Sequence, residues 1–205
     1  MSFDAESLQK HIPSYLTEED QKVLFRELKA LSSGGNADYI LNPRNDSFRN
    51  AALQGDGWRG FQLFEFETGK KRSVRGLVLS NSCDIDPENF RDLPTRIIFA
   101  PLVNLNKYKN MLENSGLDSK IIEQKINSII AQKTSNVFYL PASGALEDDY
   151  IIRLDELHSM PFSAHRESPD RQKLFTLSNT GFYMLVLKLS VHFCRLQEKI
   201  NRSSF

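Results

Sequence analysis

The sequence predicts an α+β fold in which helices pack on a small, strongly twisted antiparallel sheet. Between residues 39 and 103, short apolar runs alternate with turn residues, which is typical of strands. Helical periodicity marks residues 105–135 and the C-terminal region. With 205 residues the chain is close to the usual size of one domain, so we expect a single domain over residues 1–205.

Composition argues against a disordered chain, an overall basic nucleic-acid-binding protein and a membrane protein. Hydrophobic residues make up 40% and charged residues 25% of the chain, which is ordinary for a globular protein. The 26 basic residues balance the 26 acidic ones, so nucleic-acid binding would need a local basic patch. An acidic N-terminus and the absence of a long apolar run predict a cytosolic protein without a membrane partner. Cys83 and Cys194 are expected to stay reduced there.

Residues 1–35 are predicted as an N-terminal helical extension. Thr17 precedes three acidic residues, so it can cap the helix while the acids favour the positive end of the helix dipole. The Ser-Ser-Gly-Gly run at 32–35 ends this helix.

Residues 39–103 and 136–157 are predicted to supply the strands. Expected strands cover 57–66, 74–80, 96–103, 136–141 and 150–154. The polar residues 68–73 are predicted as a basic loop between the first two strands. Pro101 is expected at a strand end or edge, because proline cannot donate to a central ladder. The polar region 158–173 is predicted as an exposed connection.

Residues 105–135 are predicted as a helical insertion, and residues 178–202 as a long C-terminal helix. The insertion places Ile122, Ile126, Ile129 and Ile130 on one stripe. The C-terminal stripe consists of Phe182, Leu185, Val186, Leu189, Phe193, Leu196 and Ile200. Two alternatives stay open for this stripe: burial inside the chain, or a dimer seam.

The sequence gives no support for a metal or a cofactor. His11, His158, His165 and His192 are scattered, and none of them has the spacing of a zinc site. The glycine-rich phosphate-binding motifs and the hydrolase nucleophile motif are missing from the sequence. We therefore expect a metal-independent, cofactor-free protein.

The loop after the second predicted strand carries the candidate catalytic residues. Ser82, Cys83 and Asp84 follow an apolar strand, which would hold them at the edge of the sheet. Arg75 is the fourth candidate catalytic residue. Asp84 could accept a proton, and Cys83 could act as a nucleophile if a cation such as Arg75 lowered its thiol pKa. The alternative is an ordinary turn, since Ser, Asn and Asp bond readily to their own backbone.

A basic group beside these strands carries the candidate nucleic-acid-binding residues, which are Lys70, Lys71, Arg72 and Arg59. Arg75, Arg44 and Arg49 add to this group. Such a group could contact phosphates, while Trp58, Phe61 and Phe64 could stack on bases. The alternatives are a solvated hairpin loop for the lysines and a core position for the aromatic rings.

The order of short motifs resembles the PemK/MazF family of toxin-antitoxin toxins over roughly residues 57–103 and 136–200. The motifs are Gly57-Trp58, Val78-Leu79-Ser80, Ala100-Pro101-Leu102, Asp155-Glu156-Leu157 and Leu177-Ser178. This resemblance implies a small SH3-like barrel that cuts RNA without a metal. It also implies a cognate antitoxin as partner, a toxin-antitoxin or phage-defence setting, and the option of a homodimer.

Two departures from the family pattern concern its expected ribonuclease site. The arginine that would serve the phosphate is offset by one position to Arg75, so it is expected on the other face of its strand. Val103 stands where the family has a threonine, and it offers no hydroxyl. We therefore expect a protein that binds RNA with a degenerate ribonuclease site. The alternatives are a non-enzymatic protein-protein interaction module and a cysteine-dependent enzyme.

Overall fold

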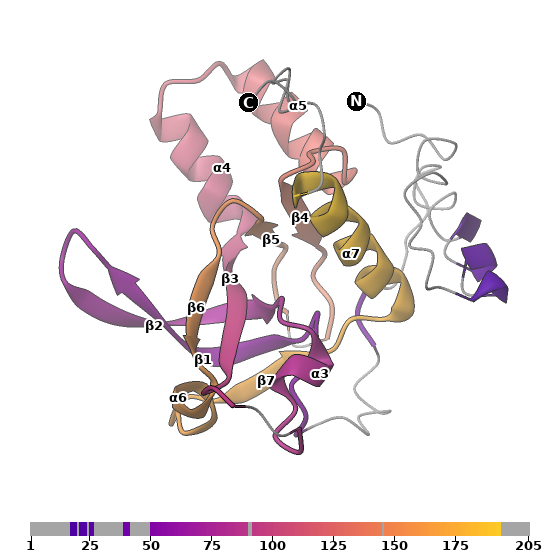
Figure 1. Ribbon diagram of the computed structural model, residues 1–205. Coiled ribbons are helices and arrows are strands. Elements are labelled where there is room, and N and C mark those ends of the chain that lie inside the picture. The colour runs from indigo at the N-terminus through magenta and orange to yellow at the C-terminus, as the bar shows by residue number, and fades with distance from the viewer. Residues whose placement is uncertain are drawn as a thin grey trace, which may run out of the picture.

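The computed structural model describes residues 17–19, 21–23, 25–26, 39–41, 50–89, 92–144 and 146–193. These residues have the predicted α+β class, with helices packed on a seven-stranded sheet whose ladders are all antiparallel (Figure 1). No helix among them combines the length and the apolar character that a membrane crossing needs. In the N-terminal extension, residues 18–19, 21–23 and 25–26 are helical, and the amide of Gln21 donates to the carbonyl of Thr17 at 2.9 Å. The rest of residues 1–35 lies outside the described ranges.

Strands β1 (Gly57–Glu65) and β2 (Lys70–Val78) form a long hairpin that projects from the body of the molecule (Figure 1). Their register runs from Gly57 opposite Leu77 to Glu65 opposite Lys70, so most of the basic stretch 68–73 is strand. The prediction of a loop there was wrong. A ladder needs only backbone donors and acceptors, so polar side chains do not end it.

A bulge interrupts this hairpin near its base. Trp58 lies opposite Gly76 and Phe61 opposite Val74, so Arg59 and Gly60 together face the single residue Arg75. Gly60 has a φ of +90°, a backbone conformation that residues with a Cβ rarely adopt. The bulge reorients β1 at Arg59.

Strand β3 (Arg96–Asn104) pairs with three other strands of the sheet. One edge of β3 pairs with β2, while the other pairs first with β6 (His158–Pro161) and then with β5 (Tyr150–Arg153). Pro101 is buried inside β3, so the expectation of a strand end or edge was wrong. Its position is tolerated because β6 pairing ends at Phe99 and β5 pairing begins at Leu102, which leaves a gap in that edge.

The region 158–173 is not the exposed connection that its polarity suggests. It forms β6, helix α6 (Phe162–Arg166) and the beginning of β7 (Gln172–Phe175), which pairs with β1. Only Met160, Phe162 and His165 are buried in residues 158–171. Isolated anchors of this kind give too little apolar periodicity to reveal a strand or a helix.

The closed barrel expected from the family resemblance is not formed by the described strands. The ladder runs in the order β4-β5-β3-β2-β1-β7, β6 pairs with β3, and the end strands β4 (Val137–Leu140) and β7 do not pair with each other. The β4–β5 hairpin instead continues the sheet toward the helices at the top of Figure 1.

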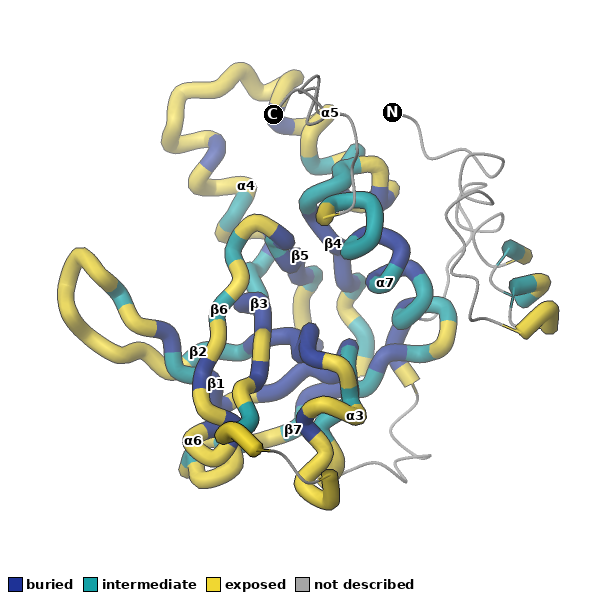
Figure 2. The backbone as a smooth tube through the Cα atoms, in the orientation of Figure 1, coloured by how far each residue is buried: buried dark blue, intermediate teal, exposed yellow. Residues whose placement is uncertain are grey.

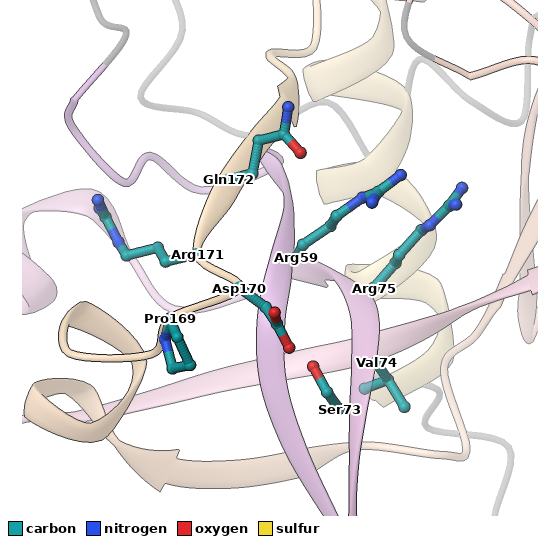
Figure 3. A pocket seen from close by; sticks show the side chains of 8 residues that line it. All are labelled: Arg59, Ser73, Val74, Arg75, Pro169, Asp170, Arg171 and Gln172. Atoms are coloured by element: carbon teal, nitrogen blue, oxygen red, sulfur yellow. The ribbon is translucent and has the colours of Figure 1, made fainter.

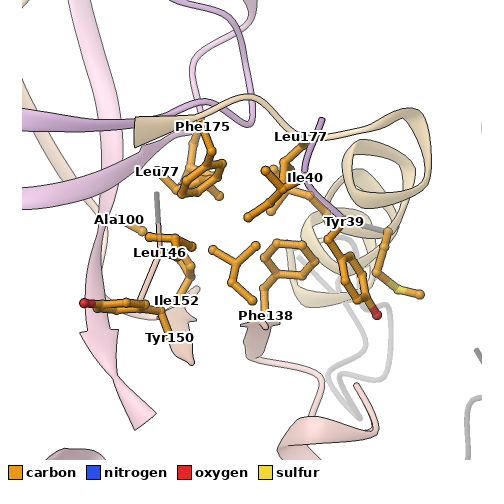
Figure 4. Packing of buried hydrophobic residues seen from close by; sticks show 14 of the residues in the cluster. Tyr39, Ile40, Leu77, Ala100, Phe138, Leu146, Tyr150, Ile152, Phe175 and Leu177 are labelled. Carbon is orange, nitrogen blue, oxygen red and sulfur yellow. The ribbon is translucent and has the colours of Figure 1, made fainter. Parts of the chain in front are cut away.

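Three apolar clusters form the core. The central cluster lies between the sheet and helix α7 (Asn179–Phe193), and Figure 4 shows how its side chains interlock. It includes Tyr39, Ile40, Leu77, Ala100, Leu146, Phe138, Tyr150, Ile152, Phe175, Leu177 and Leu185. The Trp58 cluster contains Trp58, Phe61, Val78, Ile85, Ile97, Phe99, Met160 and Phe162. The Tyr139 cluster contains Leu105, Ile129, Val137, Tyr139 and Ile151.

The helical insertion consists of α4 (Leu105–Asn114) and α5 (Ser119–Ile130), whose inner sides cover the Tyr139 cluster while most of their surface is exposed (Figure 2). In α7 the most deeply buried residues are Leu185, Leu187 and Lys188, whereas Phe193 is 57% exposed. Of the predicted stripe, Leu185 is buried, Phe182, Val186 and Leu189 are half-buried and Phe193 is exposed, so both alternatives stay open for the stripe as a whole. The predicted stripe beyond Phe193 lies outside the described residues.

Lys188 is a polar residue on the buried side of α7. Its Nζ donates to the backbone carbonyl of Thr134, at 2.8 Å, and to that of Val137. These contacts tie α7 to the segment between α5 and β4. Burial lowers the pKa of Lys188 to about 7.

Candidate functional site

A pocket of about 560 Å³ lies beside the β1 bulge (Figure 3). Strands β1 and β2 form one wall, and the turn that leads into β7 forms the other. The lining residues are Arg59, Ser73, Val74, Arg75, Pro169, Asp170, Arg171 and Gln172. The pocket is therefore polar and holds several charged side chains.

Arg59 and Arg75 give the pocket its positive charge. Figure 3 shows their side chains leaving neighbouring strands and extending in the same direction. The bulge explains this arrangement, because Arg59 is one of the two residues that face Arg75. Within the described part of the chain, neither guanidinium forms an ion pair.

Tyr150 holds Arg75 from behind. Val74 packs against the Trp58 cluster, whereas the guanidinium of Arg75 donates to the hydroxyl of Tyr150 at 3.1 Å. Figure 4 shows Tyr150 at the margin of the central cluster, with its hydroxyl directed away from the other labelled side chains. Arg75 thus lies on the opposite face of β2 from Val74, as its sequence position predicts.

A second layer of side chains supports the backbone of Arg59. The ring of His165 stacks on Phe61 with a centroid distance of 4.4 Å, and its Nε2 lies 3.3 Å from the carbonyl oxygen of Arg59. Burial lowers the pKa of His165 to about 4, and the positive charge of Arg171 acts in the same direction. The imidazole is therefore neutral at pH 7 and functions as a packing group.

Arg171 lines the pocket but directs its side chain away from the other two arginines (Figure 3). Its guanidinium carbon lies 4.2 Å above the centre of the Trp58 ring, a cation–π geometry. Burial lowers the pKa of Arg171, and the neighbouring charge of Arg166 adds to this effect. This contact attaches the pocket wall to the Trp58 cluster.

A buried ion pair anchors β7 beneath the pocket. The Nζ of Lys173 lies 2.9 Å from Oδ2 of Asp56, and their side chains are 8% and 0% exposed. The same Oδ2 accepts from the amide of Leu53 at 2.7 Å. Burial raises the pKa of Asp56, against the opposing effects of these partners.

Three of the four predicted catalytic residues lie elsewhere, and only Arg75 lines the pocket. Ser82, Cys83 and Asp84 belong to the short helix α3 (Ser82–Ile85), and none of them lines the pocket. Ser82 Oγ accepts from the amide of Gln54 at 2.9 Å, and the amide of Cys83 donates to the side chain of Asn81 at 2.9 Å. The structure does not bring these residues together with Arg75 in one pocket.

The predicted basic residues Lys70, Lys71 and Arg72 lie at the exposed end of the hairpin, away from the pocket lining. Arg72 forms an ion pair with Glu65 at 2.9 Å. Of the predicted binding residues, only Arg59 lines the pocket, where it meets Arg75, the predicted catalytic residue. Arg44 and Arg49 lie outside the described residues.

The aromatic side chains near the hairpin divide into core and surface. Trp58 and Phe61 are 2% and 0% exposed, so of the two alternatives the core position holds for these rings. Phe64 is 46% exposed, and Phe66, which the sequence analysis missed, is 87% exposed. The two exposed rings meet edge to face at 5.1 Å.

The positions taken from the family resemblance are dispersed as well. Val103 pairs with Ile151 and packs against the Tyr139 cluster, whereas Arg75 contacts Tyr150 of the central cluster. Asp155 and Glu156 both pair with Arg153, at 2.8 and 3.3 Å. The Arg153 pairing lowers the pKa of Asp155.

Sequence reasoning missed Tyr150, Asp170 and Gln172 as parts of the site. They lie far from β1 and β2 along the chain, and only the pairing of β7 with β1 and of β5 with β3 brings them close. No motif could have revealed this proximity.

No cluster of three or more His, Cys, Asp or Glu side chains that could hold a metal ion occurs among the described residues. The pocket accordingly offers cationic donors rather than metal ligands. No family model, curated protein or solved structure matches the chain. What the pocket can bind is therefore inferred from its lining residues alone.

Proposed function

We propose that the chain binds single-stranded nucleic acid, RNA in particular, with a backbone phosphate held between Arg59 and Arg75. The observation that carries this proposal is the pair of parallel guanidinium groups at one pocket, which have no ion-pair partner among the residues that the structure describes. Two like charges held side by side repel each other, and an anion placed between them relieves that repulsion.

Guanidinium groups suit this role because their planar fork matches two phosphate oxygens at once. The support behind them reduces the ordering cost of binding, since Tyr150 holds Arg75 and His165 packs behind the backbone of Arg59. Neutral donors and acceptors on Ser73 and Gln172 are available for the sugar or the base.

The hairpin end offers a second contact for a strand that leaves the pocket. Phe64 and Phe66 are exposed, and Lys71 lies directly opposite Phe64 in the ladder. Exposed aromatic rings beside cations stack on unpaired bases with little sequence preference. This combination favours a single strand over a duplex, whose bases are already stacked.

The resemblance to the PemK/MazF family supports the choice of RNA. We propose that β1, β2, β3, β6 and β7 correspond to an SH3-like barrel left open, since β6 pairs with β3 and contacts β1 through the Gln62 amide and the Met160 sulfur at 3.5 Å. The same proposal includes a cytosolic toxin-antitoxin or phage-defence setting, a cognate antitoxin and a homodimer.

We propose binding with a degenerate ribonuclease site. Val103 has no hydroxyl and packs against the Tyr139 cluster, whereas Arg75 contacts Tyr150 of the central cluster, so the expected pair of phosphate contacts is incomplete. Purified protein should leave RNA intact in a chelating buffer. Discrete cleavage that is lost in Arg75→Ala would contradict this part of the proposal.

The binding test measures the fluorescence anisotropy of a labelled 12-nucleotide RNA at several salt concentrations. Affinity should fall with salt at a logarithmic slope of roughly 0.7 for each neutralised phosphate. Arg59→Ala and Arg75→Ala should each weaken binding by about tenfold or more and make the slope shallower.

The matched control is Lys133→Ala, which removes an exposed cation near the end of α5 that does not line the pocket. This variant should bind like the parent protein. An RNA affinity that is unchanged in both arginine variants, with melting temperatures intact, would reject the pocket as the binding site.

The alternative is a protein-protein interaction module, and the end of the α4–α5 hairpin favours it. Met111, Leu117 and Ile121 are 57%, 42% and 53% exposed there. A partner held by apolar burial would bind with little dependence on salt. Salt-insensitive capture of a protein, lost in Met111→Ser but not in Arg75→Ala, would support this alternative.

A further inference from the structure

We propose that Asp170 makes the pocket selective for nucleotides that present a hydrogen-bond donor beside the bound phosphate. This inference rests on the proposed function, because it concerns the ligand of the same pocket. Asp170 is the only carboxylate among the described residues that line the pocket, and it lies on the turn between α6 and β7.

The pocket has two chemically different ends. Figure 3 shows the guanidinium groups of Arg59 and Arg75 extending toward one end, while the carboxylate of Asp170 points toward Ser73 at the other. Asp170 forms no ion pair with either arginine, nor with any other cation in the described part of the chain. The acid therefore does not neutralise the arginine pair.

A carboxylate beside a phosphate site is unfavourable unless the ligand compensates for it. An ionised Asp only accepts hydrogen bonds, and it repels the phosphate charge. A ligand that carries an anion at one end and a donor at the other satisfies both ends of the pocket. A nucleotide with a free donor has this character.

The neutral lining groups cannot supply the same selectivity. The hydroxyl of Ser73 and the carboxamide of Gln172 each donate and accept, so they accommodate either kind of ligand atom. Asp170 is exposed and its carboxylate only accepts, so a ligand donor gives it a charge-assisted hydrogen bond that a ligand without the donor cannot give. A ligand with the donor is therefore favoured over the analogue that lacks it.

The experiment tests two donors of a nucleotide: the 2′-hydroxyl of ribose, and the exocyclic amine, which adenine, cytosine and guanine carry and uracil lacks. The experiment distinguishes them with strands of one length. Its probes are an RNA, the DNA and the 2′-O-methyl strand of the same base sequence, and homopolymers of adenylate, cytidylate and uridylate. Each is titrated against the parent protein and against Asp170→Asn.

If the donor is the 2′-hydroxyl (the sugar arm), the protein should bind RNA about tenfold more tightly than both the DNA and the 2′-O-methyl strand, as expected for one hydrogen bond to a charged group. If the donor is the exocyclic amine (the base arm), the adenylate and cytidylate homopolymers should bind more tightly than uridylate by a comparable factor. In either arm, Asp170→Asn should remove most of the preference while its affinity for the disfavoured strand stays equal or rises. A simple loss of folding would weaken every strand instead.

The control is Glu167→Gln, which removes a nearby exposed carboxylate that does not line the pocket and should keep the preference. A preference that persists in Asp170→Asn, or a parent protein that binds all probes equally, overturns the role of Asp170. Arginine-dependent binding would still stand in both cases. If the parent protein binds none of the probes, the proposed function fails together with this inference.

Discussion

The two ends of the β1–β2 hairpin are both basic, but they use their charges differently. At the outer end, Lys70, Lys71 and Arg72 are exposed, and Arg72 is paired with Glu65. At the base, Arg59 and Arg75 lie beside a bulge, with buried side chains behind them and no acidic partner in the described part of the chain. The cations of the outer end are exposed, whereas those of the base line the pocket described above.

For binding an anion, the placement of positive charges matters more than their number. A mobile, solvated lysine gains little from a phosphate because water and salt screen the interaction. A guanidinium that is already held in position loses less freedom when an anion arrives. Under the proposed function, we therefore expect the base of the hairpin to provide specific binding and its outer end to provide general attraction.

The largest expected effect separates two phenylalanines of this hairpin. Phe61 is fully buried between Phe99 and His165, so Phe61→Ala should destabilise the fold by about 3–5 kcal/mol. Phe66 is 87% exposed, so Phe66→Ala should stay within about 0.5 kcal/mol of the parent. Chemical denaturation measures both values. Similar losses of stability in the two variants would show that the Phe66 side chain is packed and not exposed.

Acid should weaken the base of the hairpin through His165. Its pKa of about 4 lies below the ordinary value of 6.5, so the unfolded chain binds this proton more tightly than the folded one. Stability should therefore fall by about 1–3 kcal/mol as the pH drops from about 6.5 to 4, with no further loss from this group below that range. The free energy of unfolding measured across this range tests the sign. His165→Gln should flatten the decline, and an equally steep decline in that variant would exclude His165 as the cause.

Two glycines with positive φ give a matched pair of backbone tests. At Gly60, φ is +90° and a Cβ would lie 2.8 Å from Ser168 Oγ and 3.0 Å from the Arg171 backbone. Gly60→Ala should cost about 2–3 kcal/mol and also weaken RNA binding, because it shifts the pocket wall. At Gly69, φ is +66° and nothing lies within 4 Å, so Gly69→Ala should cost only about 1 kcal/mol. Thermal melting ranks the two, and the reverse order would contradict the bulge geometry.

The smallest effect is expected from the lysines of the outer end. Removing both charges in Lys70→Ala/Lys71→Ala should weaken RNA binding by less than about threefold at physiological salt, because exposed cations are screened. Anisotropy titrations beside Arg59→Ala/Arg75→Ala provide the comparison. If the lysine variant lost more affinity than the arginine variant, the outer end would be the principal binding surface.

Much of the fold could be predicted from local pattern. The strands at 57–65, 96–104, 137–140 and 150–153 and the helices at 105–114 and 119–130 agree with the apolar periodicity. The errors occur where the pattern is weak. The basic part of β2 is polar on both faces, and the segment with β6 and α6 has only isolated buried anchors. In both places, backbone pairing with a neighbouring strand decides the structure.

The candidate site was predicted only in part, for a physical reason. The sequence by itself determined the class of fold, the positions of most elements and the presence of cations near β1 and β2, because these depend on residues close together in the chain. Only the tertiary structure decided which cations share a pocket. The β1 bulge, the pairing of β7 with β1 and the contact of Tyr150 with Arg75 join segments that are far apart in sequence. Such contacts depend on the packing of the whole domain, which no local pattern encodes.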